Sequence, residues 1–101
     1  MVVVEVSVVP IGTGGPGLSG YVAGCLEVLA GEKDLRYQLT PMGTVIEGEL
    51  ERVLSVVRKM HEVPFDRGVA RVVTTIKIDD RRDRRLTMEG KVASVQGKLK
   101  A

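Results

Sequence analysis

Four stretches of the chain carry apolar side chains at every second position, or in runs of β-branched residues, and both patterns are typical of β-strands. They are residues 1–10, 35–40, 44–49 and 69–78. In the first stretch, one face would hold Val2, Val4, Val6 and Val8, and the other would mix valines with polar residues. Because neither face is fully polar, we expect this strand to be central in its sheet and covered on both sides.

Two further stretches repeat apolar residues at intervals of three and four, which predicts α-helices over about 18–30 and 50–63. Gly31 is placed to end the first helix, and Ser19 could cap it or lie in its first turn. Val63-Pro64 should close the second, since the residue before a proline avoids the helical region. A short third helix is predicted over about 87–99, with Thr87 as its cap.

The resulting order, β-α-β-β-α-β-α, predicts an α+β fold: a single ferredoxin-like domain over residues 1–101, with an antiparallel sheet and an extra C-terminal helix. Right-handed connections would place both crossover helices on one face of the sheet. The other face would expose valines, which is unfavourable by about 25 cal/mol per Å² of apolar surface. We therefore expect a homo-oligomer in which this face packs against another copy.

The amino-acid composition argues against several classes of function. Apolar residues make up 44% of the chain and charged residues 28%, as in a globular protein, and the net charge of +2 is too small to predict nucleic-acid binding. The single cysteine, Cys25, excludes an internal disulfide and a cysteine-based zinc site, and we interpret it as a small buried hydrophobic residue. No targeting segment or membrane span is recognisable, so we expect a cytoplasmic protein.

The segment 79–85 concentrates charge, with four arginines among three aspartates. Such mixed charge is common on surfaces, and we interpret the segment as solvated and self-neutralising. A phosphate-binding patch is the alternative.

The predicted topology brings three loops, 12–18, 40–43 and 61–68, to one end of the sheet, and binding sites favour loops on a rigid scaffold. The Thr-Pro-Met-Gly corner of the hairpin should bring Tyr37, Thr44 and Glu47 together, so that a ring, a hydroxyl and a carboxylate could hold a flat, nitrogen-rich molecule. The candidate ligand-binding residues are Ser7, Gly12, Thr13, Ser19, Tyr37, Met42, Gly43, Thr44 and Glu47.

Structural alternatives exist for several candidates. Glu47 could form an ion pair with Arg71 or Lys77, across the sheet or the subunit interface, and Tyr37 could pack in the core beneath a helix. The glycine-rich loop 12–17 could be a plain connection, since it lacks the lysine of a nucleotide-binding P-loop. His61 lies at the end of a helical apolar stripe, where a satisfied structural residue is more common than a base. No second histidine exists, and we expect no metal site.

Several blocks carry a resemblance to a known family: Ile11-Gly-Thr-Gly, Ser19 with Tyr21-Val-Ala, Pro41-Met-Gly-Thr-Val-Ile-Glu-Gly-Glu49, His61, the run 68–83, and Lys91-Val-Ala-Ser-Val95. In these blocks, which span almost the whole chain, the sequence resembles the small thiamine-binding protein family. The resemblance implies a ferredoxin-like fold, tetramers built by sheet packing, and binding of thiamine or its hydroxymethylpyrimidine moiety. It implies no catalytic activity.

The sequence therefore predicts a non-enzymatic protein that binds thiamine or a related aminopyrimidine, without a cofactor, nucleic acid or membrane as partner. A regulatory homo-oligomeric module that senses another small metabolite at a subunit interface is the first alternative, because this fold hosts many functions. An RNA-binding domain would need aromatic residues on the open sheet face, and neither central strand has one. An enzyme is disfavoured because no nucleophile has an evident base.

Overall fold

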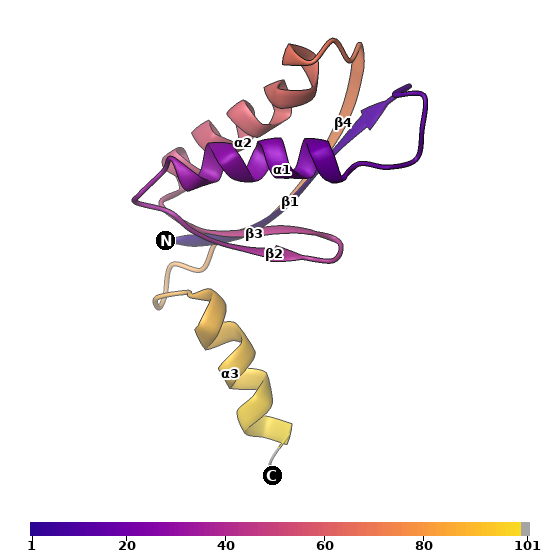
Figure 1. Ribbon diagram of the computed structural model, residues 1–101. Helices are drawn as coiled ribbons and strands as arrows, with labels where there is room; N and C mark the ends of the chain where they lie inside the picture. Colours follow the sequence, from indigo (N-terminus) through magenta and orange to yellow (C-terminus); the bar gives the residue numbers. More distant parts are fainter. Residues whose placement is uncertain (100–101) are drawn as a thin grey trace.

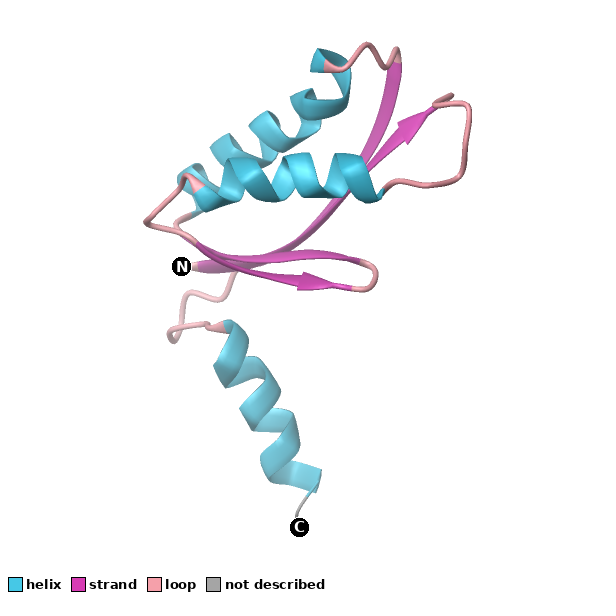
Figure 2. Ribbon diagram, viewed as in Figure 1, coloured by secondary structure: helices cyan, strands magenta, loops and turns pink. Residues whose placement is uncertain are grey.

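The computed structural model describes residues 1–99, which form a four-stranded antiparallel sheet and three helices (Figures 1 and 2). The elements, in chain order, are β1 (Val2–Ile11), α1 (Ser19–Ala30), β2 (Arg36–Thr40), β3 (Gly43–Gly48), α2 (Leu50–Asp66), β4 (Arg71–Asp79) and α3 (Met88–Leu99). The strand order is β2-β3-β1-β4. This arrangement confirms the predicted ferredoxin-like α+β fold, with β1 central as expected.

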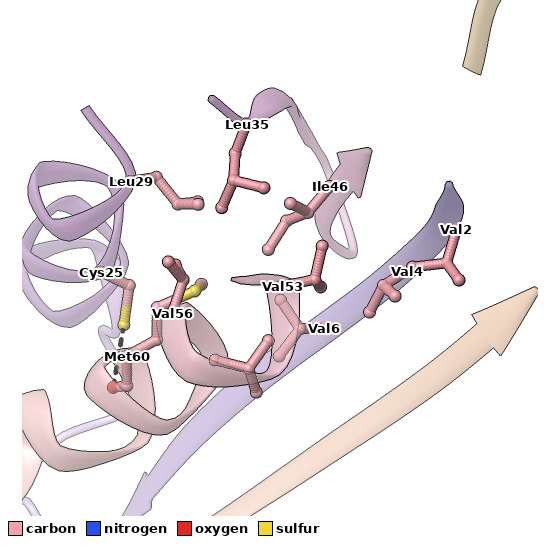
Figure 3. Close-up of a cluster of buried hydrophobic side chains, with 11 residues drawn as sticks. Val2, Val4, Val6, Cys25, Leu29, Leu35, Ile46, Val53, Val56 and Met60 are labelled. Carbon is pink, nitrogen blue, oxygen red and sulfur yellow. Dashed lines mark hydrogen bonds between the residues drawn. The ribbon is translucent and has the colours of Figure 1, made fainter. Parts of the chain in front are cut away.

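The hydrophobic core lies between the sheet and helices α1 and α2, which cover the same face (Figure 3). β1 contributes Val2, Val4 and Val6, which confirms the face predicted from the alternation of valines. The remaining core residues are Cys25, Leu29, Leu35, Ile46, Val53, Val56, Val57 and Met60. Apolar side chains from five of the seven elements, or from residues beside them, thus meet in one cluster.

Helix α2 extends beyond its predicted end. Pro64 lies inside the helix and is buried, and the helix ends only after Asp66. The prediction that Val63-Pro64 closes the helix is therefore wrong. A proline can lie near a helix end when the carbonyl that it cannot bond finds another donor, and here the Cys25 thiol donates to the Met60 carbonyl.

Helix α3 begins as predicted, since the main-chain N–H of Gly90 donates to Thr87 Oγ1 at 2.9 Å. None of its residues is buried, and it projects away from the rest of the molecule (Figure 1). Two ion pairs tie its first turns to the two edge strands, Glu89 to Arg36 on β2 and Lys91 to Asp79 on β4.

The sheet face opposite α1 and α2 is only partly covered within residues 1–99. Register places Val3, Glu5 and Ser7 on it, beside Lys77 and Thr75 of β4. We call it the open face. It has the mixed valine and polar character expected from the sequence, and packing against another copy stays a prediction. No helix within residues 1–99 is long and apolar enough to span a membrane.

Candidate functional site

A cavity of about 340 Å³ lies between the start of α1, strand β1 and the β2–β3 hairpin. We call it the hairpin cavity. Its walls are mostly apolar, with Leu18 just before α1, Val22 from α1, Leu39 from β2 and Met60 from α2. Thr44 adds a hydroxyl group from the helix side of the sheet, Ser7 and Thr40 also border the cavity, and no acidic or basic side chain among the described residues lines it. The cavity therefore suits a small, flat and largely uncharged group.

The hairpin corner is built by local hydrogen bonds. Thr40 Oγ1 accepts from the main-chain N–H of Gly43 at 3.1 Å and donates to the Gly43 carbonyl at 2.9 Å. A Cβ atom at Gly43 would lie only 3.0 Å from the main-chain oxygen of Val6. Glycine thus lets the hairpin approach β1 closely, and this approach forms one wall of the cavity.

Four of the nine predicted ligand-binding residues line the hairpin cavity: Ser7, Met42, Gly43 and Thr44. Ser7 comes from β1, and the other three come from the hairpin corner, which the predicted topology places at the same end of the sheet as the loop after β1. Their roles in binding stay predictions, although the structure brings them together.

Three predicted residues of the first loop lie outside the cavity. Gly12 has a φ of +78°, which favours glycine, and Thr13 Oγ1 donates to the Gly15 carbonyl at 2.9 Å, so both shape the loop. Ser19 is the first residue of α1 and makes no capping hydrogen bond, since Leu18 holds the N-cap position. Leu18 is the residue of this region that reaches the cavity.

The expectation that Tyr37, Thr44 and Glu47 meet is wrong. Tyr37 pairs with Ile46 across the hairpin, whereas Glu47 pairs with Arg36. Because side chains alternate along a strand, Tyr37 and Thr44 lie on the helix side of the sheet and Glu47 lies on the open face. Tyr37 is also 41% exposed on its edge strand, so the alternative that places it in the core beneath a helix is wrong as well.

Glu47 is buried, with 1% of its side chain exposed, and its nearest cation is Arg36, whose Nη1 lies 3.6 Å from Oε2. The predicted ion pair with Arg71 or Lys77 across the sheet is wrong, because both belong to β4 and β1 separates that strand from β3. The same pair across a subunit interface stays a prediction. Oε2 has no hydrogen-bond partner among residues 1–99. A buried carboxylate without such a partner is energetically costly.

His61 is a satisfied structural residue, as the sequence suggests. Its Nδ1 lies 2.7 Å from Thr74 Oγ1, and its ring packs edge-on against Phe65 with centroids 5.4 Å apart. Within the described part of the chain, no three histidine, cysteine or acidic side chains lie close enough to hold a metal ion.

Cys25 lines the hairpin cavity from α1 while its side chain is buried. Burial raises the pKa of its thiol, and the nearby positive charge of Arg67 offsets only part of this effect. The thiol therefore stays protonated at neutral pH, and it behaves as the small hydrophobic residue that the sequence predicts.

The apolar walls of the cavity escaped the sequence analysis. Leu18 and Val22 belong to the apolar stripe of α1, and Leu39 belongs to the alternation of β2. An apolar residue that lines a cavity and one that fills the core give the same periodicity, so no pattern separates them.

Comparison with known proteins identifies the family. A model of the thiamine-binding protein family matches residues 4–96. The chain belongs to this family. A relative from Bacillus subtilis, UPF0045 protein YqgV, is 47% identical to the chain over 98% of both sequences. A UPF0045 protein from Methanothermobacter thermautotrophicus is 41% identical over 98% of this chain and 100% of its own length.

Solved structures agree with this assignment. The crystal structure of protein MJ1052 from Methanocaldococcus jannaschii superposes with a TM-score of 0.85 at 40% identity, and covers 94% of this chain and 95% of its own. A Thermotoga maritima protein named for thiamine biosynthesis or salvage gives a TM-score of 0.73 at 25% identity, over 93% of this chain and 97% of its own. The fold of this chain is thus shared by proteins from both bacteria and archaea.

Proposed function

We propose that this protein binds thiamine or its hydroxymethylpyrimidine moiety in the hairpin cavity, without catalysing a reaction. The observation that carries this proposal is a cavity of about 340 Å³, with apolar walls and the hydroxyl of Thr44, in a member of the thiamine-binding family. Ligand cavities of roughly 300–1,000 Å³ with this character are typical of small-molecule sites.

The cavity chemistry favours the pyrimidine ring over the thiazolium ring. A flat ring would pack between Leu18, Val22 and Met42, while the hydroxyl of Thr44 would exchange hydrogen bonds with ring nitrogens or an amino group. Because no acidic side chain from residues 1–99 lines the cavity, a cationic ring would enter it uncompensated. Hydroxymethylpyrimidine should therefore bind at least as tightly as thiamine.

A binding role without catalysis is supported by the partners of the reactive groups. Cys25 donates to the Met60 carbonyl, and Thr40 exchanges hydrogen bonds with the main chain of Gly43. Neither group has a histidine or carboxylate partner among the described residues, so neither is activated as a nucleophile.

We further propose that the protein works in the cytoplasm as a homo-oligomer, with four subunits that pack through their open faces. Support comes from Val73, which is 46% exposed on the open face, and from valines of β1 and β3 on the same face. Burying such surface against another copy is favourable. The hairpin cavity lies on the opposite side of the sheet and would stay accessible.

Calorimetry with thiamine and with hydroxymethylpyrimidine tests the proposed function. Thr44→Val keeps the shape of the side chain but removes a hydroxyl from the cavity, and we expect it to weaken binding by roughly three- to tenfold. Ser55→Ala is the control, because it also removes a hydroxyl, and Ser55 is exposed on α2 and does not line the cavity. If neither compound binds at millimolar concentration, or if both variants weaken binding equally, the proposal is wrong.

A further inference from the structure

A second cavity, of about 520 Å³, lies between the charged segment 79–85 and the first turns of α3. We call it the arginine cavity, because its lining includes Arg81, Arg84 and Arg85, together with Lys91 from α3. It shares no lining residue with the hairpin cavity. The structure thus gathers four cationic side chains around one hollow that the proposed function does not use.

The segment is only partly self-neutralising. Arg82 forms an ion pair with Asp80 at 2.8 Å, and Arg81 forms one with Asp83 at 2.6 Å. By contrast, Arg84 and Arg85 form no ion pair with any residue from 1 to 99. The excess positive charge of the segment is therefore concentrated on the two arginines that line the cavity and precede α3.

Other lining groups suit an anion with an organic part. Thr87 and Ser94 contribute hydroxyls, and the positive end of the dipole of the 12-residue helix α3 lies beside them. Leu86 and Val95 form apolar walls. The one acidic residue in the lining, Asp79, is already paired with Lys91.

We propose that the arginine cavity is a binding site for the phosphate or diphosphate group of a soluble organic phosphate. Guanidinium groups donate paired, parallel hydrogen bonds that match phosphate oxygens, and such charge-assisted bonds are stronger than neutral ones. Arg84 and Arg85 hold these donors without a competing carboxylate, and the hydroxyls of Thr87 and Ser94 add neutral donors. This inference is independent of the function proposed for the hairpin cavity.

A titration of the ¹⁵N-labelled full chain with sodium pyrophosphate, followed by NMR, tests the site. Sodium chloride at the same ionic strength is the reference. We expect saturable shifts of the Thr87, Gly90 and Ser94 amides with pyrophosphate and none that saturate with chloride. Arg84→Gln and Arg85→Gln should each weaken pyrophosphate binding by about tenfold, because each removes a charge-assisted donor.

Arg82→Gln is the matched control. It removes one positive charge from the same segment, but Arg82 is neutralised by Asp80 and does not line the cavity. Its affinity for pyrophosphate should stay within about twofold of the parent chain. The proposal is overturned if chloride reproduces the shifts, or if Arg82→Gln weakens binding as much as Arg84→Gln. It is also overturned if pyrophosphate does not bind. If a thymidine oligonucleotide then binds with affinity that grows with its length, the result indicates a diffuse surface for nucleic acid.

Discussion

The thiol of Cys25 donates a hydrogen bond to the main-chain carbonyl of Met60, with Sγ 3.5 Å from the oxygen (Figure 3). In a regular helix this carbonyl would accept the N–H of residue 64, but Pro64 has none. The first helix thus supplies the donor that the second helix lacks. This contact explains how α2 continues past a proline, and it joins the two helices that cover the core.

A double-mutant cycle measures this contact. Cys25→Ala should lower the free energy of unfolding by about 1–2 kcal/mol, because it leaves the Met60 carbonyl unsatisfied and removes a buried sulfur. In a Pro64→Ala background the new amide can bond to that carbonyl, so the cost of Cys25→Ala should fall by about 0.5–1.5 kcal/mol. Urea unfolding of the parent, the two single variants and the double variant gives the coupling free energy between the two positions. Additive effects would show that the thiol does not replace the missing amide.

Cys25 should also make the protein less stable in alkali. Burial raises the pKa of its thiol in the folded state, whereas a cysteine in the unfolded chain has a pKa of about 8.5. The folded state therefore binds the proton more tightly, and the free energy of unfolding should be level below that pH and fall as the pH rises above it. Urea unfolding between about pH 7.5 and 9.5 checks this, and Cys25→Ser, which does not titrate there, should show a shallower decline.

An ion-pair cluster predicts the behaviour in acid. Arg52 of α2 binds Asp34 at 2.7 Å and also Glu32, and Lys59 binds Glu32 at 3.0 Å. Hydrogen bonds from Lys59 and then Arg52 lower the pKa of Glu32, and Arg52 lowers that of Asp34. The contribution of these ion pairs to the free energy of unfolding is present above about pH 4.3, where the carboxyls of the unfolded chain are ionised. It is lost as the pH falls through the lower pKa values that the two carboxyls have in the folded state.

Replacing Arg52 by Gln should therefore make stability less dependent on pH between about 5 and 3. Arg58→Gln is the matched control, since Arg58 is an exposed residue of the same helix and has no ion pair with residues 1–99. Thermal unfolding at several pH values compares the three proteins. Equal acid slopes for both variants would show that the cluster does not hold the 31–35 connection to α2.

The spacing of apolar residues and the residue types of the turns predict most of the fold. The same two signals also predict the correct face for Glu47, which the sequence analysis placed wrongly. The valine alternation of β1 identified its buried face, because a period of two assigns each side chain to one side. The same rule applies to the hairpin once its loop is taken as Pro41 and Met42, so that Thr40 pairs with Gly43. Counting back from that pair places Glu47 opposite Arg36 and away from Tyr37.

The rest of the site depends on tertiary contacts that no local pattern encodes. The hairpin cavity arises where Leu18 and Leu39 fail to fill the space between a helix and a hairpin. The continuation of α2 through Pro64 depends on a thiol 39 positions earlier in the chain. Likewise, which arginines of the charged segment are neutralised depends on how the loop folds, so the phosphate-binding alternative could not be judged from composition alone.

The pair formed by Arg36 and Glu47 carries the last prediction. Arg36→Gln should lower the free energy of unfolding at pH 7 by about 1–2 kcal/mol, because it leaves the Glu47 carboxylate buried without its nearest cation. Adding Glu47→Gln should restore the loss, since a neutral amide removes the charge that burial penalises. Urea unfolding at low and high sodium chloride is the suitable measurement, because guanidinium chloride is itself a salt and would screen the ion pair.

The control for this cycle is Glu89→Gln, because Arg36 also binds Glu89 at the start of α3. Both side chains of that second pair are exposed, so its loss should cost at most about 0.5 kcal/mol and should shrink in high salt. The cost of Arg36→Gln should persist in salt, because the Glu47 side chain is only 1% exposed and ions cannot reach it. A cost of Arg36→Gln that disappears in high salt, or that Glu47→Gln fails to restore, would show that the buried carboxylate does not depend on Arg36.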